Sequence, residues 1–188
     1  MIGLLLSLFT VEAADIGDTA PDFKLMTVSG ESISLSDYRG KTVVLEWFNP
    51  GCPFVKYAHG EGRMKVLASK WRAKDIVWLA VNSGGAGKQG AAPEDNTAAI
   101  SDWSISYPIA MDPTGEVGQL YSAKTTPQMY IVNTEGLLVY QGALDNAPMG
   151  RKSGDYVSYV SDALTSLRNG TPIEVPETKP YGCSVKYK

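Results

Sequence analysis

Cysteine and histidine are scarce in this chain, whose 188 residues include two cysteines and one histidine. Two cysteines are too few for a disulfide scaffold. These three residues are also scattered along the sequence, which does not suit a structural zinc site with its four clustered ligands. We therefore expect neither a metal nor another cofactor.

Positive charge and long apolar runs are also in short supply. The net charge is −3, so the sequence offers no basic surface of the kind that binds nucleic acid. No apolar run approaches the roughly 18 residues that a membrane-spanning helix needs, so no membrane span is predicted. The length suits one domain with a sizeable core.

The first residues carry a short apolar run at 2–9, followed by Val11 and Ala13. This pattern fits the h-region and cleavage site of a signal peptide. No basic residue precedes the run, so we expect residues 1–14 to be a signal peptide with a truncated start; a buried N-terminal strand is the alternative. A signal peptide predicts export to the periplasm or the extracellular space, where two cysteines could pair or one could act alone.

Short apolar runs alternate with segments of helical periodicity along the rest of the chain. Residues 43–45 are continuously apolar, as in a strand buried on both faces, and Pro53 is placed to open a helix. We expect a hairpin around Gly30, strands at 41–48, 76–81, 107–111, 129–132 and 137–141, a loop at 82–96, and helices at 53–71 (broken at Gly60 and Gly62), 97–103, 116–121 and 156–168. This order predicts an α/β fold over residues 15–170, with a central mixed β-sheet flanked by helices, and an extended C-terminal tail at 171–188.

Cys52 has the strongest claim to chemistry. It lies where the strand at 41–48 ends and the helix opened by Pro53 begins. A helix N-terminus carries partial positive charge and unpaired N–H groups, which stabilise a thiolate, the reactive form of cysteine. An inert buried cysteine is the alternative, because cysteine also packs as a small hydrophobe. We take Cys52 as the catalytic nucleophile.

Glu46 precedes Cys52 inside an otherwise apolar strand. A buried carboxylate is costly unless it is paired or protonated, and a raised pKa would let it pass protons to a departing thiolate. Strand alternation places Glu46 and Phe48 on one side and Leu45 and Trp47 on the other. A solvated edge position is the alternative. Glu46 is the second candidate catalytic residue.

Two further residues bear on Cys52. His59 shares its helix face, but about 10 Å of helix rise separates them, so we expect a structural or capping histidine. Cys183 lies on the tail and could resolve an oxidised Cys52 by forming a disulfide; an unpaired structural thiol is the equal alternative. The tail has apolar and aromatic residues with which to dock near the helix after Cys52: Ile173, Val175, Tyr181, Val185 and Tyr187.

Three motifs in combination point to a known family. They are Glu46-x-Phe48-x-Pro50-x-Cys52-Pro53, then Thr126-Pro127 before Tyr130-Ile131-Val132-Asn133, and the tail Lys179-Pro180-x-Gly182-Cys183-Ser184-Val185-Lys186. Together they resemble the thioredoxin-like superfamily, in its redoxin group of the alkyl hydroperoxide reductase/thiol-specific antioxidant (AhpC/TSA) type and the peroxiredoxin-like branch of that group. The resemblance covers about residues 15–188.

The resemblance implies a thioredoxin-like fold in which a cis Thr126–Pro127 bond packs against Cys52. It also implies that Glu46 takes the place of the buried acid of thioredoxins. We take Thr126 and Pro127, with Pro53 at the helix start, as the candidate substrate-binding residues.

The chain departs from the family pattern at several positions. Val55 stands where the second cysteine of a Cys-x-x-Cys pair would be, so Cys52 needs Cys183 or an outside thiol to complete a redox cycle. Asn49 and Pro127 stand where peroxiredoxins carry a hydroxyl residue and a guanidinium. Missing donors at those positions disfavour efficient peroxide activation.

These observations predict an exported, thiol-dependent oxidoreductase with thiol–disulfide chemistry at Cys52. Its partners would be an external thiol or dithiol reductant and a protein disulfide or a peroxide as substrate. One alternative is a peroxiredoxin-like peroxidase in which Cys183 is the resolving cysteine. The other is a non-catalytic binding module, in which the groove at Thr126 and Pro127 holds an extended peptide by strand-type hydrogen bonds.

Overall fold

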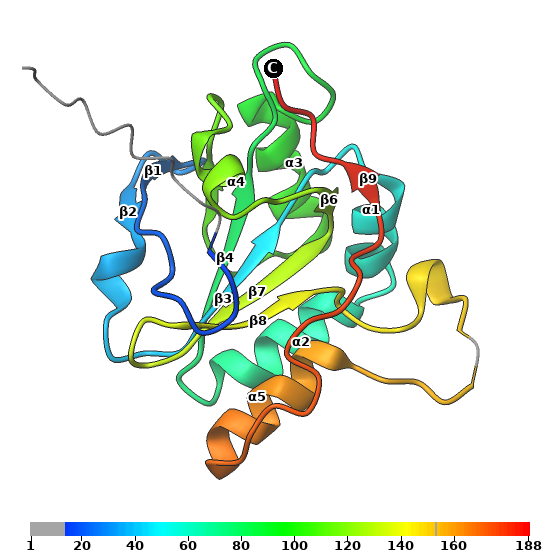
Figure 1. Ribbon diagram of the computed structural model, residues 1–188. Coiled ribbons are helices and arrows are strands. Elements are labelled where there is room, and N and C mark those ends of the chain that lie inside the picture. Colours follow the sequence, from blue (N-terminus) through cyan, green and yellow to red (C-terminus); the bar gives the residue numbers. More distant parts are fainter. Residues whose placement is uncertain (1–13, 153) are drawn as a thin grey trace, which may run out of the picture.

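The centre of the molecule is a mixed sheet of seven strands with helices packed on it (Figure 1). The structure is a computed structural model that describes residues 14–152 and 154–188; the signal peptide expected at 1–14 lies outside them, except for its last position. The strands are β1 (Lys24–Thr27), β2 (Ser32–Ser34), β3 (Val43–Trp47), β4 (Val77–Asn82), β5 (Ile109–Met111), β6 (Thr125–Thr126), β7 (Gln128–Val132), β8 (Leu138–Gly142) and β9 (Cys183–Ser184). The helices are α1 (Pro53–Gly60), α2 (Arg63–Arg72), α3 (Pro93–Trp103), α4 (Glu116–Leu120) and α5 (Tyr159–Asn169), with short 3-10 helices η1 (Leu35–Tyr38) and η2 (Pro148–Gly150).

The strand order of the large sheet is β2-β1-β5-β4-β3-β7-β8. β3, β4 and β5 run parallel, and the remaining strands join antiparallel toward both edges. The predicted α/β fold with a central mixed sheet is therefore confirmed, as is the hairpin around Gly30. β3 is buried along its whole length, which accounts for its continuous apolar run.

Side-chain alternation along β3 divides the core between the two faces of the sheet. Val44 and Phe48 pack with side chains from α1, α2, α3 and α5. Val43, Leu45 and Trp47 pack on the other face with α4, η1 and the residues around the β1–β2 hairpin. The facing expected from the period of two is confirmed.

Some element boundaries differ from the prediction. α3 begins at Pro93, inside the expected loop, because Pro93 occupies the first helical turn and Glu94 and Asp95 face the helix dipole there. α5 begins at Tyr159, three residues later than expected. Across residues 14–152 and 154–188, no helix has the length and apolar character needed to cross a membrane.

The tail after α5 folds back over the molecule to the start of α1 (Figure 1, red). Ile173 packs against the core, and the tail then bonds to β8, where the Gln141 N–H donates to the Pro176 carbonyl over 3.0 Å. Farther on, β9 pairs antiparallel with β6, and Thr126 lies opposite Cys183. Tyr187 then donates its hydroxyl to the Ala123 carbonyl over 2.7 Å. The expected docking of the tail is confirmed, and the small β6–β9 sheet is an addition to the prediction.

Candidate active site

Cys52 is the N-cap residue of α1, with Pro53 in the first turn. Its carbonyl accepts the Lys56 N–H over 2.9 Å, the first hydrogen bond of the helix. The side chain is 2% exposed. The predicted place of Cys52 at a strand end and helix start is therefore what the structure has, and its sulfur lies near free backbone N–H groups.

The loop before Cys52 is held by Asn49, whose side chain is buried. Its Oδ1 accepts the Gly51 N–H over 2.8 Å, and its Nδ2 donates to the Gln89 carbonyl over 2.9 Å. The amide is thus used within the loop and not on a ligand at Cys52. Asn49 thus fixes the loop that presents the cysteine.

Thr126 is the neighbour of Cys52 across the fold. The Cys52 thiol donates to the Thr126 carbonyl over 2.9 Å, and the Thr126–Pro127 bond is cis, as expected. The Thr126 hydroxyl is buried and has no hydrogen-bond partner in the part of the chain that the structure describes. It is therefore free to donate to Cys52 when the thiol is ionised.

Cys183 is brought to Cys52 by the β6–β9 pairing. Cys183 packs against the core cluster that contains Cys52, and the two sulfurs lie close enough to shift each other's pKa. Both are free thiols. Cys52 is buried, whereas Cys183 is partly exposed. The tail cysteine, whose distance from Cys52 the sequence could not give, thus lies at the predicted nucleophile.

The pKa values of the two thiols are shifted in opposite directions. Burial acts to raise the pKa of Cys52, but the Cys183 thiol, the Thr126 side chain and the Val55 N–H can all donate to the thiolate, and this outweighs burial and holds the pKa below its ordinary value. Burial, together with the hydrogen bond and charge of Cys52, raises the pKa of Cys183 to about 11. Cys52 therefore ionises first, and Cys183 keeps its proton and donates it to the thiolate.

The close approach of β9 depends on Gly182. This residue has φ +141°, and a Cβ placed there would overlap the carbonyl oxygen of Thr126. Only glycine adopts this backbone region without strain. The residue before Cys183 must therefore be small and conformationally free for the two cysteines to meet.

Glu46 lies fully buried in β3. Its Oε1 is 2.8 Å from His59 Nε2, and its Oε2 accepts the Tyr107 hydroxyl over 2.9 Å. Burial, and next the charge of Glu46, raise the pKa of Tyr107 well above its usual value, so the phenol remains a donor. His59 also stacks on Trp103, with ring centroids 5.2 Å apart. The ring of His59 is thus held between Glu46 and Trp103, and Glu46 bonds to His59 and Tyr107 rather than to the Cys52 thiol.

Two of the three candidate substrate-binding residues, Pro53 and Thr126, lie directly next to Cys52. Pro53 follows it in α1, the carbonyl of Thr126 at the end of β6 accepts its thiol, and Pro127 follows Thr126 through the cis bond. However, the outer edge of β6 is paired with β9. The groove that an extended peptide would enter is therefore occupied by the chain's own tail. Within residues 14–152 and 154–188 there is no group of three metal-ligating side chains.

Comparison with known protein families agrees with this arrangement. Residues 16–141, well over half of the chain, match the model of the AhpC/TSA family. The chain belongs to the AhpC/TSA family. The AhpC/TSA match includes Cys52, Glu46, Thr126 and Pro127, and it ends before the tail that carries Cys183.

The names of two relatives of this AhpC/TSA chain refer to thioredoxin or to thiol–disulfide chemistry. The chain is 30% identical over 139 residues to the thioredoxin-like protein YneN of Bacillus subtilis, and this match covers 72% of this chain and 77% of that protein. It is 30% identical over 135 residues to the thiol-disulfide oxidoreductase ResA of Oceanobacillus iheyensis, over 69% of this chain and 66% of that protein. A crystal structure of an uncharacterized conserved protein from Geobacillus kaustophilus covers 93% of each chain with a TM-score of 0.82 at 30% identity. The thioredoxin-like fold is confirmed.

Proposed function

We propose that Cys52 and Cys183 form the redox couple through which this chain, a thiol-dependent oxidoreductase of the AhpC/TSA family, exchanges electrons with protein thiols and disulfides. The observation that carries the proposal is the β6–β9 pairing, which sets Cys183 opposite Thr126, the residue whose carbonyl accepts the Cys52 thiol. Their sequence separation excludes a Cys-x-x-Cys motif. The tail instead supplies the second cysteine that the helix start lacks.

The chemistry of the reducing half-cycle follows from the two acidities. The Cys52 thiolate attacks one sulfur of a substrate disulfide, which forms a mixed disulfide and releases the other substrate sulfur as a thiolate. Cys183 then loses its proton and attacks the Cys52 sulfur. The Cys52–Cys183 disulfide forms, and the second substrate sulfur departs as a thiolate. The substrate gains two electrons, and the cysteine pair loses two.

Access to Cys52 requires that β9 move. The Cys52 side chain is 2% exposed, and the β6 edge beside it carries β9. An extended substrate segment would take the place of β9 along Thr125 and Thr126, with Pro53 and Pro127 at the two sides of the sulfur. The tail thus acts first as an intramolecular occupant of the groove and then as the source of the resolving thiol.

Return to the reduced state needs an external thiol or dithiol. In the Cys52–Cys183 disulfide the better leaving group is Cys52, because its thiol is the more acidic of the two. Cys183 is also the more exposed cysteine. We therefore expect the reductant to attack the Cys183 sulfur and to release the Cys52 thiolate.

Peroxide reduction is less well supported by the same site. Its polar groups near Cys52 are backbone groups, the Thr126 hydroxyl and Cys183, and the Asn49 amide is already bonded to Gly51 and Gln89. None of the described hydrogen bonds places a guanidinium at Cys52. A peroxide at Cys52 would therefore find few donors to stabilise the charge on its leaving oxygen, which disfavours peroxide reduction at this site.

The test compares three proteins on two substrates. Wild type, Cys52→Ser and Cys183→Ser are each given a disulfide-bonded protein or hydrogen peroxide, with a dithiol reductant. We expect wild type to prefer the disulfide, Cys52→Ser to be inactive, and Cys183→Ser to accumulate a mixed disulfide at Cys52. Activity in Cys52→Ser, or turnover of peroxide alone by wild type, would overturn the proposal.

Export belongs to the same proposal. It is supported by the signal-like sequence at residues 2–13 and by chemistry that suits an oxidising compartment. Fractionation of a bacterial host that expresses the chain, with N-terminal sequencing of the product, tests it. Cleavage after Ala13 and recovery outside the cytoplasm are expected; an uncleaved cytoplasmic product would contradict export.

A further inference from the structure

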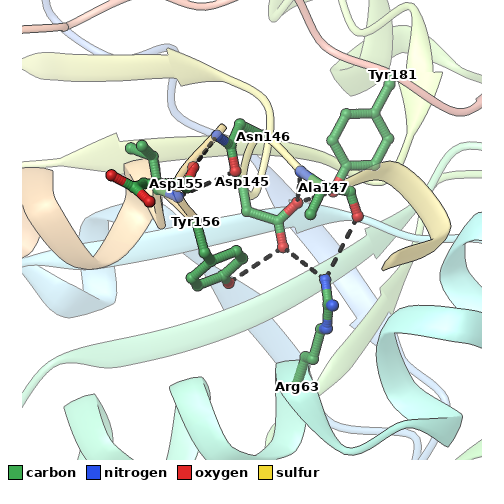
Figure 2. Close-up of polar contacts among 8 residues, drawn as sticks. Arg63, Asp145, Asn146, Ala147, Asp155, Tyr156 and Tyr181 are labelled. Carbon is green, nitrogen blue, oxygen red and sulfur yellow. Dashed lines mark hydrogen bonds and ion pairs between the residues drawn. The ribbon is translucent and has the colours of Figure 1, made fainter. Parts of the chain in front are cut away.

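A buried carboxylate, Asp145, lies just after β8 and is 1% exposed. Four donors surround its carboxylate (Figure 2). Its Oδ1 accepts the Tyr181 hydroxyl over 2.6 Å and the Ala147 N–H over 2.8 Å. Its Oδ2 accepts the Tyr156 hydroxyl over 3.2 Å and Arg63 Nη1 over 3.3 Å. The carboxylate is fully paired, as a buried charge must be, yet no step at Cys52 uses it directly.

Tyr181 is the donor that comes from the tail, two residues before Cys183. Its ring also packs against Phe54 of α1, with centroids 6.0 Å apart. Burial and the hydrogen bond to Asp145 raise the pKa of Tyr181 above its usual range, so the hydroxyl remains a donor. Tyr181 is thus held on one side by the carboxylate and on the other by the residue two positions after Cys52.

Two other tail anchors flank Tyr181 and Cys183. Upstream, the Thr178 hydroxyl accepts the Ala143 N–H over 2.8 Å. Downstream, the Val185 N–H donates to the Lys124 carbonyl over 3.0 Å. Between these two anchors, the side chain of Tyr181 ties the tail to the body of the protein through its hydrogen bond to Asp145. Loss of that bond would loosen the tail just before Cys183, while the Thr178 and Val185 anchors and the β6–β9 pairing stay in place.

We propose that Asp145 is the positioning residue of Cys183, and that it acts through the hydroxyl of Tyr181 to hold the Cys183 sulfur within reach of Cys52. The inference rests on the proposed function, because it concerns the step in which Cys183 attacks the Cys52 sulfur of the mixed disulfide. That step stays as written above, with the substrate leaving as a thiolate. Asp145 and Tyr181 touch neither substrate nor sulfur, and they raise the local concentration of the resolving thiol.

The experiment uses two tyrosines that donate to the same carboxylate. Tyr181→Phe removes the donor on the tail, and Tyr156→Phe is the matched control that removes the donor outside it. The equilibrium of the Cys52–Cys183 disulfide with glutathione is measured in the full chain. We expect Tyr181→Phe to weaken the disulfide roughly tenfold, as for loss of one charge-assisted hydrogen bond, and Tyr156→Phe to leave it unchanged. Asp145→Asn should shift the equilibrium in the same direction as Tyr181→Phe.

The acidity of Cys52 gives a second readout that a merely structural role would not move. Because the Cys183 thiol helps to lower the pKa of Cys52, Tyr181→Phe should raise that pKa toward its value in Cys183→Ala. Added to Cys183→Ala, the Tyr181→Phe change should have no further effect. The Cys52 pKa is followed by the ultraviolet absorbance of its thiolate.

The outcomes separate the two levels of the proposal. If wild type forms the disulfide and Tyr181→Phe matches it in both readouts, the positioning role is refuted and the redox couple stands. If both tyrosine variants weaken the disulfide equally and unfold at the same lowered temperature, Asp145 serves the fold alone and the inference is also refuted. If wild type forms no Cys52–Cys183 disulfide, the proposed function fails and the inference fails with it.

Discussion

Replacement of Gly182 by alanine is the perturbation that acts most locally on the meeting of the two cysteines. The new Cβ would overlap the Thr126 carbonyl oxygen and lie 3.2 Å from the Pro127 nitrogen. It would also sit at φ +141°, where a side chain costs on the order of 1–3 kcal/mol. Because the clash is with backbone, the neighbours cannot yield by a rotamer change, and β9 must move away from β6.

The size of the effect can be worked from these contacts. If docking of Cys183 weakens by about 2 kcal/mol, its effective concentration at Cys52 falls roughly thirtyfold, at about 1.4 kcal/mol per factor of ten. The disulfide then becomes less stable relative to the dithiol. For a two-electron couple this raises the reduction potential, making it less negative by about 45 mV.

The assay is a redox titration of Gly182→Ala against glutathione, with Gly30→Ala as the control. Gly30 also has a positive φ, +85°, but a Cβ there meets nothing within 4 Å, and the residue lies in the distant β1–β2 hairpin. The control should lose some global stability and keep the potential of wild type. A Gly182→Ala protein with the wild-type potential would refute the claim that β9 places Cys183 on Cys52.

Two further predictions concern proton-linked behaviour. Burial and Cys52 raise the pKa of Cys183 from 9.0 to about 11 in the fold, so the stability that this shift contributes is present below about pH 9 and is lost as the pH rises toward about 11. Across that window the melting temperature of the reduced protein should fall more steeply than that of Cys183→Ser. Parallel melting curves would contradict this prediction. We also predict that Glu46 assists proton transfer, so Glu46→Gln should slow turnover and leave the fold intact, because an amide cannot carry the proton. Tyr107→Phe removes one hydrogen bond to the same carboxylate and should slow turnover less. Wild-type rates in Glu46→Gln across neutral pH would show that Glu46 is a structural residue.

The parts of the fold that sequence predicted are those with local signals. The apolar run at 43–45 marks a buried strand, and the proline at position 53 marks the start of a helix, each through its own chemistry. Pro93 is the same kind of signal for the start of α3. It follows a glycine-rich stretch, and for that reason the sequence predicted a loop through this position. β6 and β9 have two residues each, too few for any periodicity, so their pairing could not be predicted.

The candidate site divides in the same way. Cys52 was predictable because a strand end, a helix start and a proline are adjacent in the sequence. The partners that tune it are not: Thr126 lies 74 residues from Cys52, and Tyr107 lies 61 residues from Glu46. Asp145 gave no signal, because an aspartate in a turn-rich stretch usually faces solvent, and only the docked tail shows what it binds.

The most direct test of the Cys52–Cys183 couple is a non-reducing peptide map of the protein after mild oxidation with oxidised glutathione. Reductant-free digestion and mass spectrometry identify the peptides joined through sulfur, and the mass of the intact protein shows whether the bond lies within one chain. The account predicts one peptide pair that joins Cys52 to Cys183 in a monomeric mass. Recovery of Cys183 as a free thiol, with Cys52 joined to glutathione or oxidised alone, would contradict it.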